Sequence, residues 1–188
     1  DIRVELREIS LKNRPQELYQ ISQKGTVPVL IISDDLVIDE SLEIMLWVIA
    51  NHEKNSWMSE DLSKELNLID LNDNIFKKWL DMYKYHDRYP KHSRQYYRKE
   101  CDKILYEYEN RLITSNFFLK NDISMADVAI FPFIRQYANV DYDWFSGHYK
   151  NLELWLEKIV SSKLFTTVMN KYSEWDPNQK PLIINFND

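Results

Sequence analysis

Glycine is scarce in this chain, which has only two, Gly25 and Gly147, among its 188 residues. Average usage would give about 13. A phosphate-binding P-loop needs two glycines and a following lysine at fixed spacing, and a dinucleotide-binding fingerprint needs three glycines close together. Because neither motif is present, the sequence excludes ATP, GTP or NAD binding through such a loop.

Cysteine and long apolar runs are also lacking. The single cysteine, Cys101, cannot form an internal disulfide and argues against a cysteine-based metal site. The longest apolar runs, such as residues 27–32, are far too short to cross a bilayer. The net charge of −6 argues against a general nucleic-acid binder. With no signal peptide ahead of the first element, we expect a cytoplasmic protein that binds neither membrane nor nucleic acid.

Apolar and aromatic residues are plentiful, at 44% and 14% of the chain, and suffice for a sizeable core. The first part of the chain predicts the order β-α-β-β-α. Ile2, Val4 and Leu6 alternate with charged residues, as in a strand with one wet face. Residues 27–32 indicate a buried strand, and a turn at 33–35 joins it to a second strand. Two helices complete this part, one after Pro15 and one carrying Leu42, Met45, Leu46 and Ile49.

Only helical patterns follow. Three apolar stripes recur at helical spacing. They comprise Leu68, Leu71, Ile75, Trp79 and Met82; Cys101, Leu105, Tyr108 and Leu112; and Leu152, Trp155, Leu156 and Ile159. We therefore expect an α/β domain over residues 1–52, a linker over 53–62 and an all-helical domain over 63–188.

Several conspicuous residues are interpreted as structural. Ser124 and Asp127 form a capping box, with Asp in place of the usual Glu or Gln, which marks a helix start. Cys101 shares its stripe with Leu105, so we expect a buried, inert thiol. The histidines show no pair at helical spacing with a third ligand, so no metal site is expected.

Two short motifs in residues 1–52 each allow two interpretations. Pro28 cannot donate to a strand ladder. Either the Val27–Pro28 bond is cis, which turns the Val27 main chain toward an extended peptide ligand, or Pro28 is an ordinary trans proline at the start of a strand. Residues 39–41 open a helix, where the dipole favours a ligand carboxylate and Glu40 suits an ammonium. That corner fits the head group of an amino acid, or it is a plain N-cap.

The order of these motifs resembles the cytosolic glutathione transferases, over residues 2–169. Residues 25–30 and 39–41 are similar to the family's two glutathione-binding signatures, and 124–127 to its capping box. Residues 151–156 resemble its penultimate helix. The resemblance implies α/β plus all-α architecture: a thioredoxin-like N-terminal domain, incomplete here, followed by the family's helical bundle.

The same resemblance implies the ligand contacts. Val27 would pair through its main chain with the cysteinyl part of glutathione, with Pro28 cis. Glu40 and Ser41 would hold the γ-glutamyl ammonium and carboxylate. Arg14 stands where the bacterial omega-like branch has a basic residue that reaches the glycyl end, and a guanidinium suits a terminal carboxylate.

The family's first strand and helix, with a catalytic Cys, Ser or Tyr, would precede Asp1, so the catalytic residue is unknown. The omega-like Arg14 favours a Cys type, which would exchange thiols with a mixed disulfide or deglutathionylate it. A Ser or Tyr type would conjugate glutathione to a small electrophile. The resemblance thus implies a detoxifying glutathione transferase or thiol transferase, a homodimer, with glutathione as co-substrate and no metal.

Residues 77–103 are basic and rich in tyrosine. They form either a solvated helical face over packed aromatics or a binding surface. In the resembled family these helices flank the second-substrate pocket, which makes Tyr83 and Tyr89 candidates for lining it. An alternative function is that of a non-catalytic regulator similar to the stringent-starvation proteins, which bind RNA polymerase. This stretch would then be the partner surface.

Overall fold

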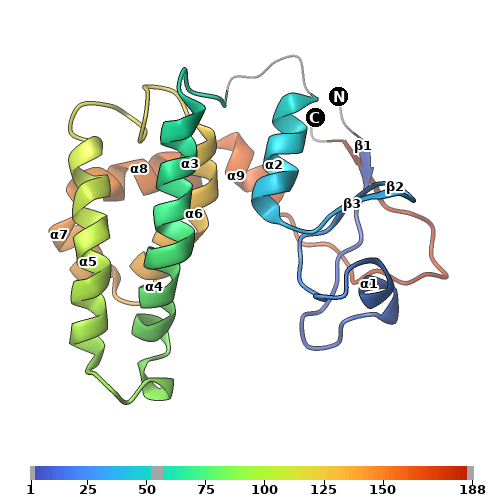
Figure 1. Cartoon of the computed structure of the whole chain (residues 1–188), viewed down its shortest axis with the longest axis horizontal. Coiled ribbons are helices and arrows are strands. Elements are labelled where there is room, and N and C mark those ends of the chain that lie inside the picture. Colours follow the sequence, from blue (N-terminus) through green and yellow to red (C-terminus); the bar gives the residue numbers. More distant parts are fainter. Residues whose placement is uncertain (1–2, 52–56, 186–188) are drawn as a thin grey trace. The chain divides into compact units, whose positions relative to one another are not determined.

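The chain divides into two compact units. Unit 1 comprises residues 1–48 and 161–188, and unit 2 comprises residues 49–160. The computed structural model describes residues 3–51 and 57–185. Figure 1 shows short strands together with helices in unit 1 and helices in unit 2.

Unit 1 contains a hairpin in which β2 (Leu30–Ser33) pairs antiparallel with β3 (Leu36–Ile38). The predicted turn between them is confirmed, but the prediction of a buried strand over residues 27–32 is wrong. The strand begins only at Leu30, because Pro28 cannot donate to the ladder. Side chains alternate between the two faces of a strand, and Ile31 on the outer face is 45% exposed.

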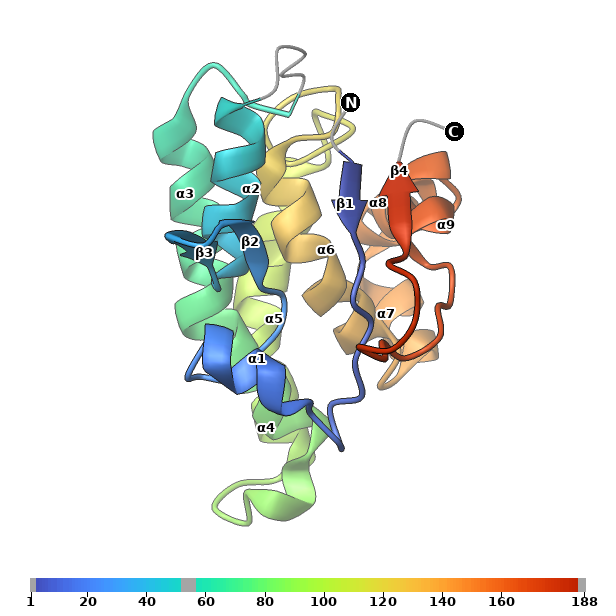
Figure 2. The same cartoon turned by 90° about the vertical axis from the view of Figure 1, so that its right-hand side faces the viewer.

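A second two-stranded sheet joins the two ends of unit 1. In it, β1 (Arg3–Glu5) pairs antiparallel with β4 (Ile183–Asn185), as Figure 2 shows. The predicted first strand is thus present, although Ile2 lies outside the described residues. The expectation of helices up to residue 188 differs from the structure, in which the last helix among the residues up to 185 is α9 (Lys163–Val168). Prolines in the segment after α9 favour an extended chain.

The two predicted helices of residues 1–52 are present. α1 (Gln16–Ile21) follows Pro15, whose fixed backbone angle suits a helix start. α2 (Ser41–Ala50) carries the predicted apolar positions, of which Ile49 is buried. The prediction that His52 closes this part of the chain falls on a residue outside the described ranges.

In the part of unit 2 that the structure describes, the regular elements are helical. These are α3 (Leu62–Leu71), the π-helical turn η1 (Asn72–Phe76), α4 (Lys77–Lys84), the 3-10 turn η2 (His86–Arg88), α5 (Arg94–Arg111), α6 (Met125–Ala138), α7 (Tyr142–His148) and α8 (Lys150–Val160). α3, η1 and α4 form one continuous rod in Figure 1. α4 packs against α5, α3 against α6, and α5 against α8.

The buried face of the α3–η1–α4 rod differs from the predicted stripe. Ile75, which was placed in the stripe, is 46% exposed, whereas Phe76 and Tyr83 are 0% and 1% exposed. A π-helical turn adds a residue to one turn, which shifts the following face by about one position. Phe76 instead packs against Tyr137, with ring centroids 6.2 Å apart. The other two stripes, on α5 and α8, are confirmed as buried.

Buried carboxylates hold the helix ends of unit 2. The capping box at the start of α6 is confirmed, with the Ser124 main-chain N–H donating to Asp127 Oδ2 at 2.9 Å. Asp127 Oδ1 also accepts from the Trp155 indole at 2.8 Å and from the Phe118 N–H at 3.0 Å. This one carboxylate therefore fixes α6, α8 and the loop before α6 together.

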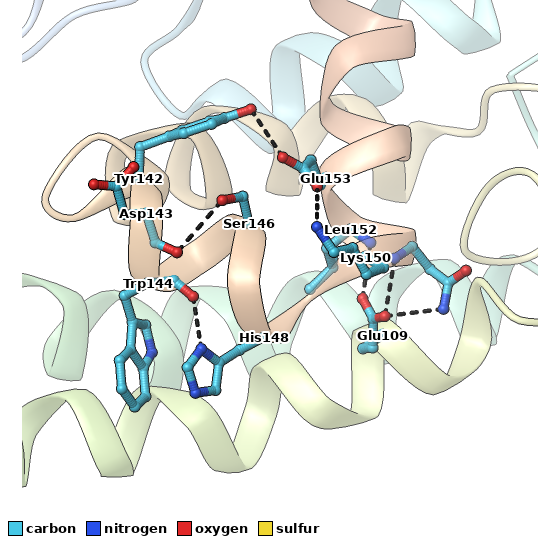
Figure 3. Close-up of polar contacts among 10 residues, drawn as sticks. Glu109, Tyr142, Asp143, Trp144, Ser146, His148, Lys150, Leu152 and Glu153 are labelled. Carbon is cyan, nitrogen blue, oxygen red and sulfur yellow. Dashed lines mark hydrogen bonds and ion pairs between the residues drawn. The ribbon is translucent and has the colours of Figure 1, made fainter.

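Glu109 of α5 does the same for α8. Its carboxylate accepts the main-chain N–H groups of Asn151 and Leu152 at 2.9 and 2.8 Å. Figure 3 shows Glu109 beside Leu152. The first N–H groups of a helix have no partner within the helix. A side chain from α5 thus satisfies the start of α8 and locks the two helices in register.

Candidate functional site

The β2–β3 hairpin brings the two predicted glutathione motifs to one place. Leu30 pairs with Ile38, so the residues just before β2 and just after β3 lie at the same end of the hairpin. Hydrogen bonds tie these flanks together, because the Ser22 hydroxyl donates to Asp39 Oδ2 at 2.7 Å. The loop that leads to Val27 therefore lies beside the start of α2.

The loop has the conformation that one of the two interpretations requires. The Val27–Pro28 peptide bond is cis. Val27 is 46% exposed and lies outside the β2–β3 ladder. Among the residues that the structure describes, none forms a hydrogen bond with the Val27 main chain. Its N–H and C=O groups are therefore accessible to an extended ligand.

Gly25 is needed at the start of this loop. Its φ of +59° lies in the left-handed region, which side chains other than hydrogen disfavour. A Cβ atom there would also stand 2.3 Å from the Tyr19 ring. One of the two glycines of the chain thus allows α1 and the Val27 loop to pack closely.

The start of α2 presents an acidic pair, Asp39 and Glu40, followed by Ser41. The Glu40 carbonyl accepts the first helical hydrogen bond, from Ile44 N–H at 3.0 Å. The Glu40 side chain is 58% exposed and that of Asp39 is 27% exposed. A helix start favours an anion through its dipole and N–H groups, while an exposed carboxylate favours a cation. This corner can hold both charges of an amino-acid head group.

Lys24 is a charged member of this corner that sequence reasoning missed. Its ammonium lies 2.6 Å from Glu40 Oε1 and 3.0 Å from Asp39 Oδ1. Hydrogen bonds to Glu40 and then Asp39 raise the pKa of Lys24. The available signal was its position as the basic residue directly before Gly25 in the signature.

The pKa of Asp39 shows which of its hydrogen bonds most favours the carboxylate form. The hydrogen bond from Ser22 and, second, that from Lys24 lower the pKa of Asp39 below its usual 3.8. Asp39 is therefore held as a carboxylate by a neutral donor as well as by a cation. Because Asp39 is already bonded twice, Glu40 is the more available of the two acids for a ligand.

Arg14 is exposed in the loop between a turn, where Asn13 N–H donates to the Ser10 carbonyl, and α1. Among the described residues, no hydrogen bond or ion pair ties Arg14 to the Val27 loop or to the start of α2. The structure thus brings Val27, Glu40 and Ser41 to one end of the hairpin and leaves Arg14 unconnected to them.

The two tyrosines predicted for a second-substrate pocket lie differently in unit 2. Tyr83 is 1% exposed and packs against Tyr137, with ring centroids 5.3 Å apart. It offers almost no surface to a ligand. Tyr89 donates its hydroxyl to Asp81 and borders a hollow of about 530 Å³. That hollow is lined by Trp79, Met82, Arg88, Tyr89, Pro90, Lys91, His92 and Tyr97.

Other reactive side chains have structural surroundings. Cys101 is 0% exposed, as predicted, and burial raises the pKa of its thiol far above the usual range. The His148 ring in Figure 3 stacks on Trp144 at 3.6 Å and bonds through Nδ1 to the Trp144 carbonyl. Over residues 3–51 and 57–185, no cluster of three or more His, Cys, Asp or Glu side chains is arranged to hold a metal ion.

Comparison with known proteins identifies the class to which this two-part fold belongs. A family model of the glutathione S-transferase N-terminal domain matches residues 1–56, and a model of the C-terminal domain matches residues 71–163. The chain therefore belongs to the glutathione S-transferase family. It has that family's thioredoxin-like N-terminal domain followed by its helical C-terminal domain. No protein of curated function matches the sequence significantly.

Solved structures of low sequence identity share the fold. A glutathione transferase from Phanerochaete chrysosporium, in complex with oxidized glutathione, matches with a TM-score of 0.69 at 16% identity, covering 82% of this chain and 76% of that one. One from Populus trichocarpa matches with a TM-score of 0.65 at 16% identity, covering 82% and 78%. A class Gtt2 transferase of Vibrio parahaemolyticus gives 0.64 at 17%, covering 86% and 81%. Of the helices described, none is both long and apolar enough for a membrane span.

Proposed function

We propose that this chain binds glutathione at the end of the β2–β3 hairpin and uses it as a co-substrate. In this proposal Glu40 holds the γ-glutamyl ammonium and Ser41 the adjacent carboxylate. The Val27 main chain pairs with the cysteinyl part, and Arg14 reaches the glycyl carboxylate. The observation that carries the proposal is the accessible Val27 main chain beside an exposed acid at a helix start.

The reaction proposed is attack by the glutathione sulfur on a second substrate. The thiolate is the reactive form of a thiol, so an enzyme gains by lowering the pKa of the bound thiol. The second substrate is a small electrophile in a conjugation or a mixed disulfide in a thiol transfer. Cys101 serves neither reaction, because its thiol is fully buried and strongly disfavours ionisation.

Glutathione titration by calorimetry tests the binding corner. Glu40→Ala and Ser41→Ala should each weaken binding about tenfold or more, since a hydrogen bond to a charged group contributes about 1.5–3 kcal/mol. Glu43→Ala is the matched control, because Glu43 is an exposed acid in the first turn of the same helix. Unchanged affinity in both site variants would contradict the assignment of this corner.

The second-substrate site is proposed to include Tyr89. An apolar electrophile would contact its ring in the hollow of unit 2, so Tyr89→Ala should raise the KM for the electrophile and leave the affinity for glutathione unchanged. An unaltered KM contradicts this role. We also propose that the chain belongs to the omega-like, Cys-type branch, on the basis of Arg14. We propose in addition that the protein is a cytoplasmic homodimer. Light scattering of the full-length protein tests the dimer.

A further inference from the structure

Lys24 pairs with Glu40, the acid that binds the ligand ammonium in the proposed function. Its ammonium is 2.6 Å from Glu40 Oε1, closer than the 3.0 Å to Asp39 Oδ1. Lys24 lies in the loop before Val27, whereas Glu40 lies at the start of α2. The ion pair therefore links the loop before Val27 to the start of α2 across the binding corner.

A ligand ammonium and the Lys24 ammonium cannot both use Glu40 without repulsion. Two like charges about 4 Å apart in water repel by a small but measurable amount. Asp39 can retain Lys24 after the exchange, because it already accepts a hydrogen bond from that ammonium. The Lys24 ammonium can therefore stay paired with Asp39 after it leaves Glu40.

We propose that Lys24 is an internal competitor, which occupies Glu40 in the free protein and yields it to the ammonium of the incoming ligand. The inference rests on the proposed function and adds to the same site a residue that lowers its affinity for ligands with an α-ammonium. It predicts that a ligand with this ammonium competes with Lys24 for Glu40. A ligand acylated on the amine does not use Glu40, so Lys24 leaves its affinity unchanged.

The size of the effect follows from the exposure of the pair. The Lys24 side chain is 52% exposed, so solvent screens its attraction to Glu40. Exposed ion pairs contribute between almost nothing and about fivefold in an equilibrium constant. Removing Lys24 should therefore strengthen glutathione binding by about two- to fivefold. An exchange of this size is readily reversible, as a competitor in a substrate site must be.

Calorimetric titration of the full-length protein with two ligands tests the inference. The ligands are glutathione and glutathione acetylated on its α-amine. Lys24→Met should bind glutathione about two- to fivefold more tightly than the wild type does, with no gain for the acetylated ligand. Lys24→Arg keeps the charge and should stay near the wild type. Lys163→Met on α9 is the matched control, an exposed lysine whose loss changes the net charge equally.

A double variant locates the competition at Glu40. In the Glu40→Gln background, Lys24→Met should give no further gain, since the contested acid is gone. Weaker or equal glutathione binding by Lys24→Met overturns the inference, and so does an equal gain for the acetylated ligand. Absence of glutathione binding in every variant, the wild type included, instead overturns the proposed function and the inference with it. The two failures are therefore distinguishable.

Discussion

Acidic side chains are used in opposite ways in the two units. In unit 2, Glu65 and Asp127 are 0% exposed and accept main-chain N–H groups, such as that of Ala126, which donates to Glu65 at 2.6 Å. In unit 1, the side chains of Asp39 and Glu40 are 27% and 58% exposed. Buried acids with fixed donors hold helices in place, whereas an exposed acid beside a lysine can change its partner. We therefore expect the buried acids Glu65 and Asp127 to contribute to stability, and Asp39 and Glu40 to contribute little to it.

The largest effect is expected from Asp127→Ala. The substitution leaves the buried N–H groups of Phe118, Ser124 and Trp155 without their acceptor. Each unsatisfied buried donor costs about 1–3 kcal/mol, and three donors are affected. The free energy of unfolding should therefore fall by about 3–5 kcal/mol, as measured by urea denaturation.

Glu40→Ala in unit 1 is the matched comparison for stability. Because Glu40 is exposed, its loss should change the free energy of unfolding by less than about 0.5 kcal/mol. Asp127→Asn retains one acceptor oxygen and should cost less than Asp127→Ala. Similar losses for Glu40→Ala and Asp127→Ala would break the comparison between the units.

Truncation of an apolar residue should also lower the free energy of unfolding more in unit 2 than in unit 1. Leu105 is 0% exposed on α5, whereas Ile31 on β2 is 45% exposed. Truncation of a buried leucine typically costs about 2–5 kcal/mol, while a half-exposed side chain loses only part of its burial. We expect Leu105→Ala to lower the free energy of unfolding several times more than Ile31→Ala does. Equal losses would show that Ile31 is covered in solution.

Periodicity explains why the helices of unit 2 were largely predictable. Leu105 and Trp155 repeat at helical spacing with their neighbours, and both are buried as predicted. The predicted stripe around Ile75 is wrong, because the local pattern of apolar residues does not indicate a π-helical turn. The pairing of β1 with β4 was also missed, since contacts between distant short strands leave no periodic signal.

The candidate site was predictable only as two separate motifs. The residue types at Val27 and Glu40 left two interpretations open, and only the resemblance to the glutathione transferases favoured a binding site at both. The hairpin that brings their segments together followed from the turn. Lys24 was missed, because its role depends on the distance to Glu40 and not on a motif. The burial of Tyr83 was likewise invisible, since a tyrosine in a basic helix suits either a surface or a core.

Cys101 offers a smaller test on the side of unit 2. Its thiol is fully buried, and burial raises its pKa, so the thiolate population is minimal at neutral pH. A thiol-specific reagent should label the native protein far more slowly than the protein unfolded in urea. Cys101→Ala should cost about 1 kcal/mol of stability and leave glutathione affinity unchanged. Rapid labelling of the native protein contradicts this burial.

The smallest effect concerns Asp39, which stands between the two kinds of acid. Its pKa is lowered from 3.8, first by the Ser22 hydroxyl and then by Lys24. A depressed pKa in the folded state means that the contribution of Asp39 to stability is present above its unfolded value and is lost as the pH falls through its folded value. The window for this loss therefore lies below pH 3.8.

Carboxyl titration by NMR in Ser22→Ala and Lys24→Met decides to which kind Asp39 belongs. Both variants should raise the pKa of Asp39 toward 3.8, and Ser22→Ala should raise it more, because the Ser22 hydrogen bond is the larger cause. Asp39 would then resemble the acids of unit 2, held by a fixed neutral donor. A larger rise in Lys24→Met would place it with Glu40 as a partner held mainly by charge. In that case the attraction between Asp39 and Lys24 would hold the lysine in place when it leaves Glu40.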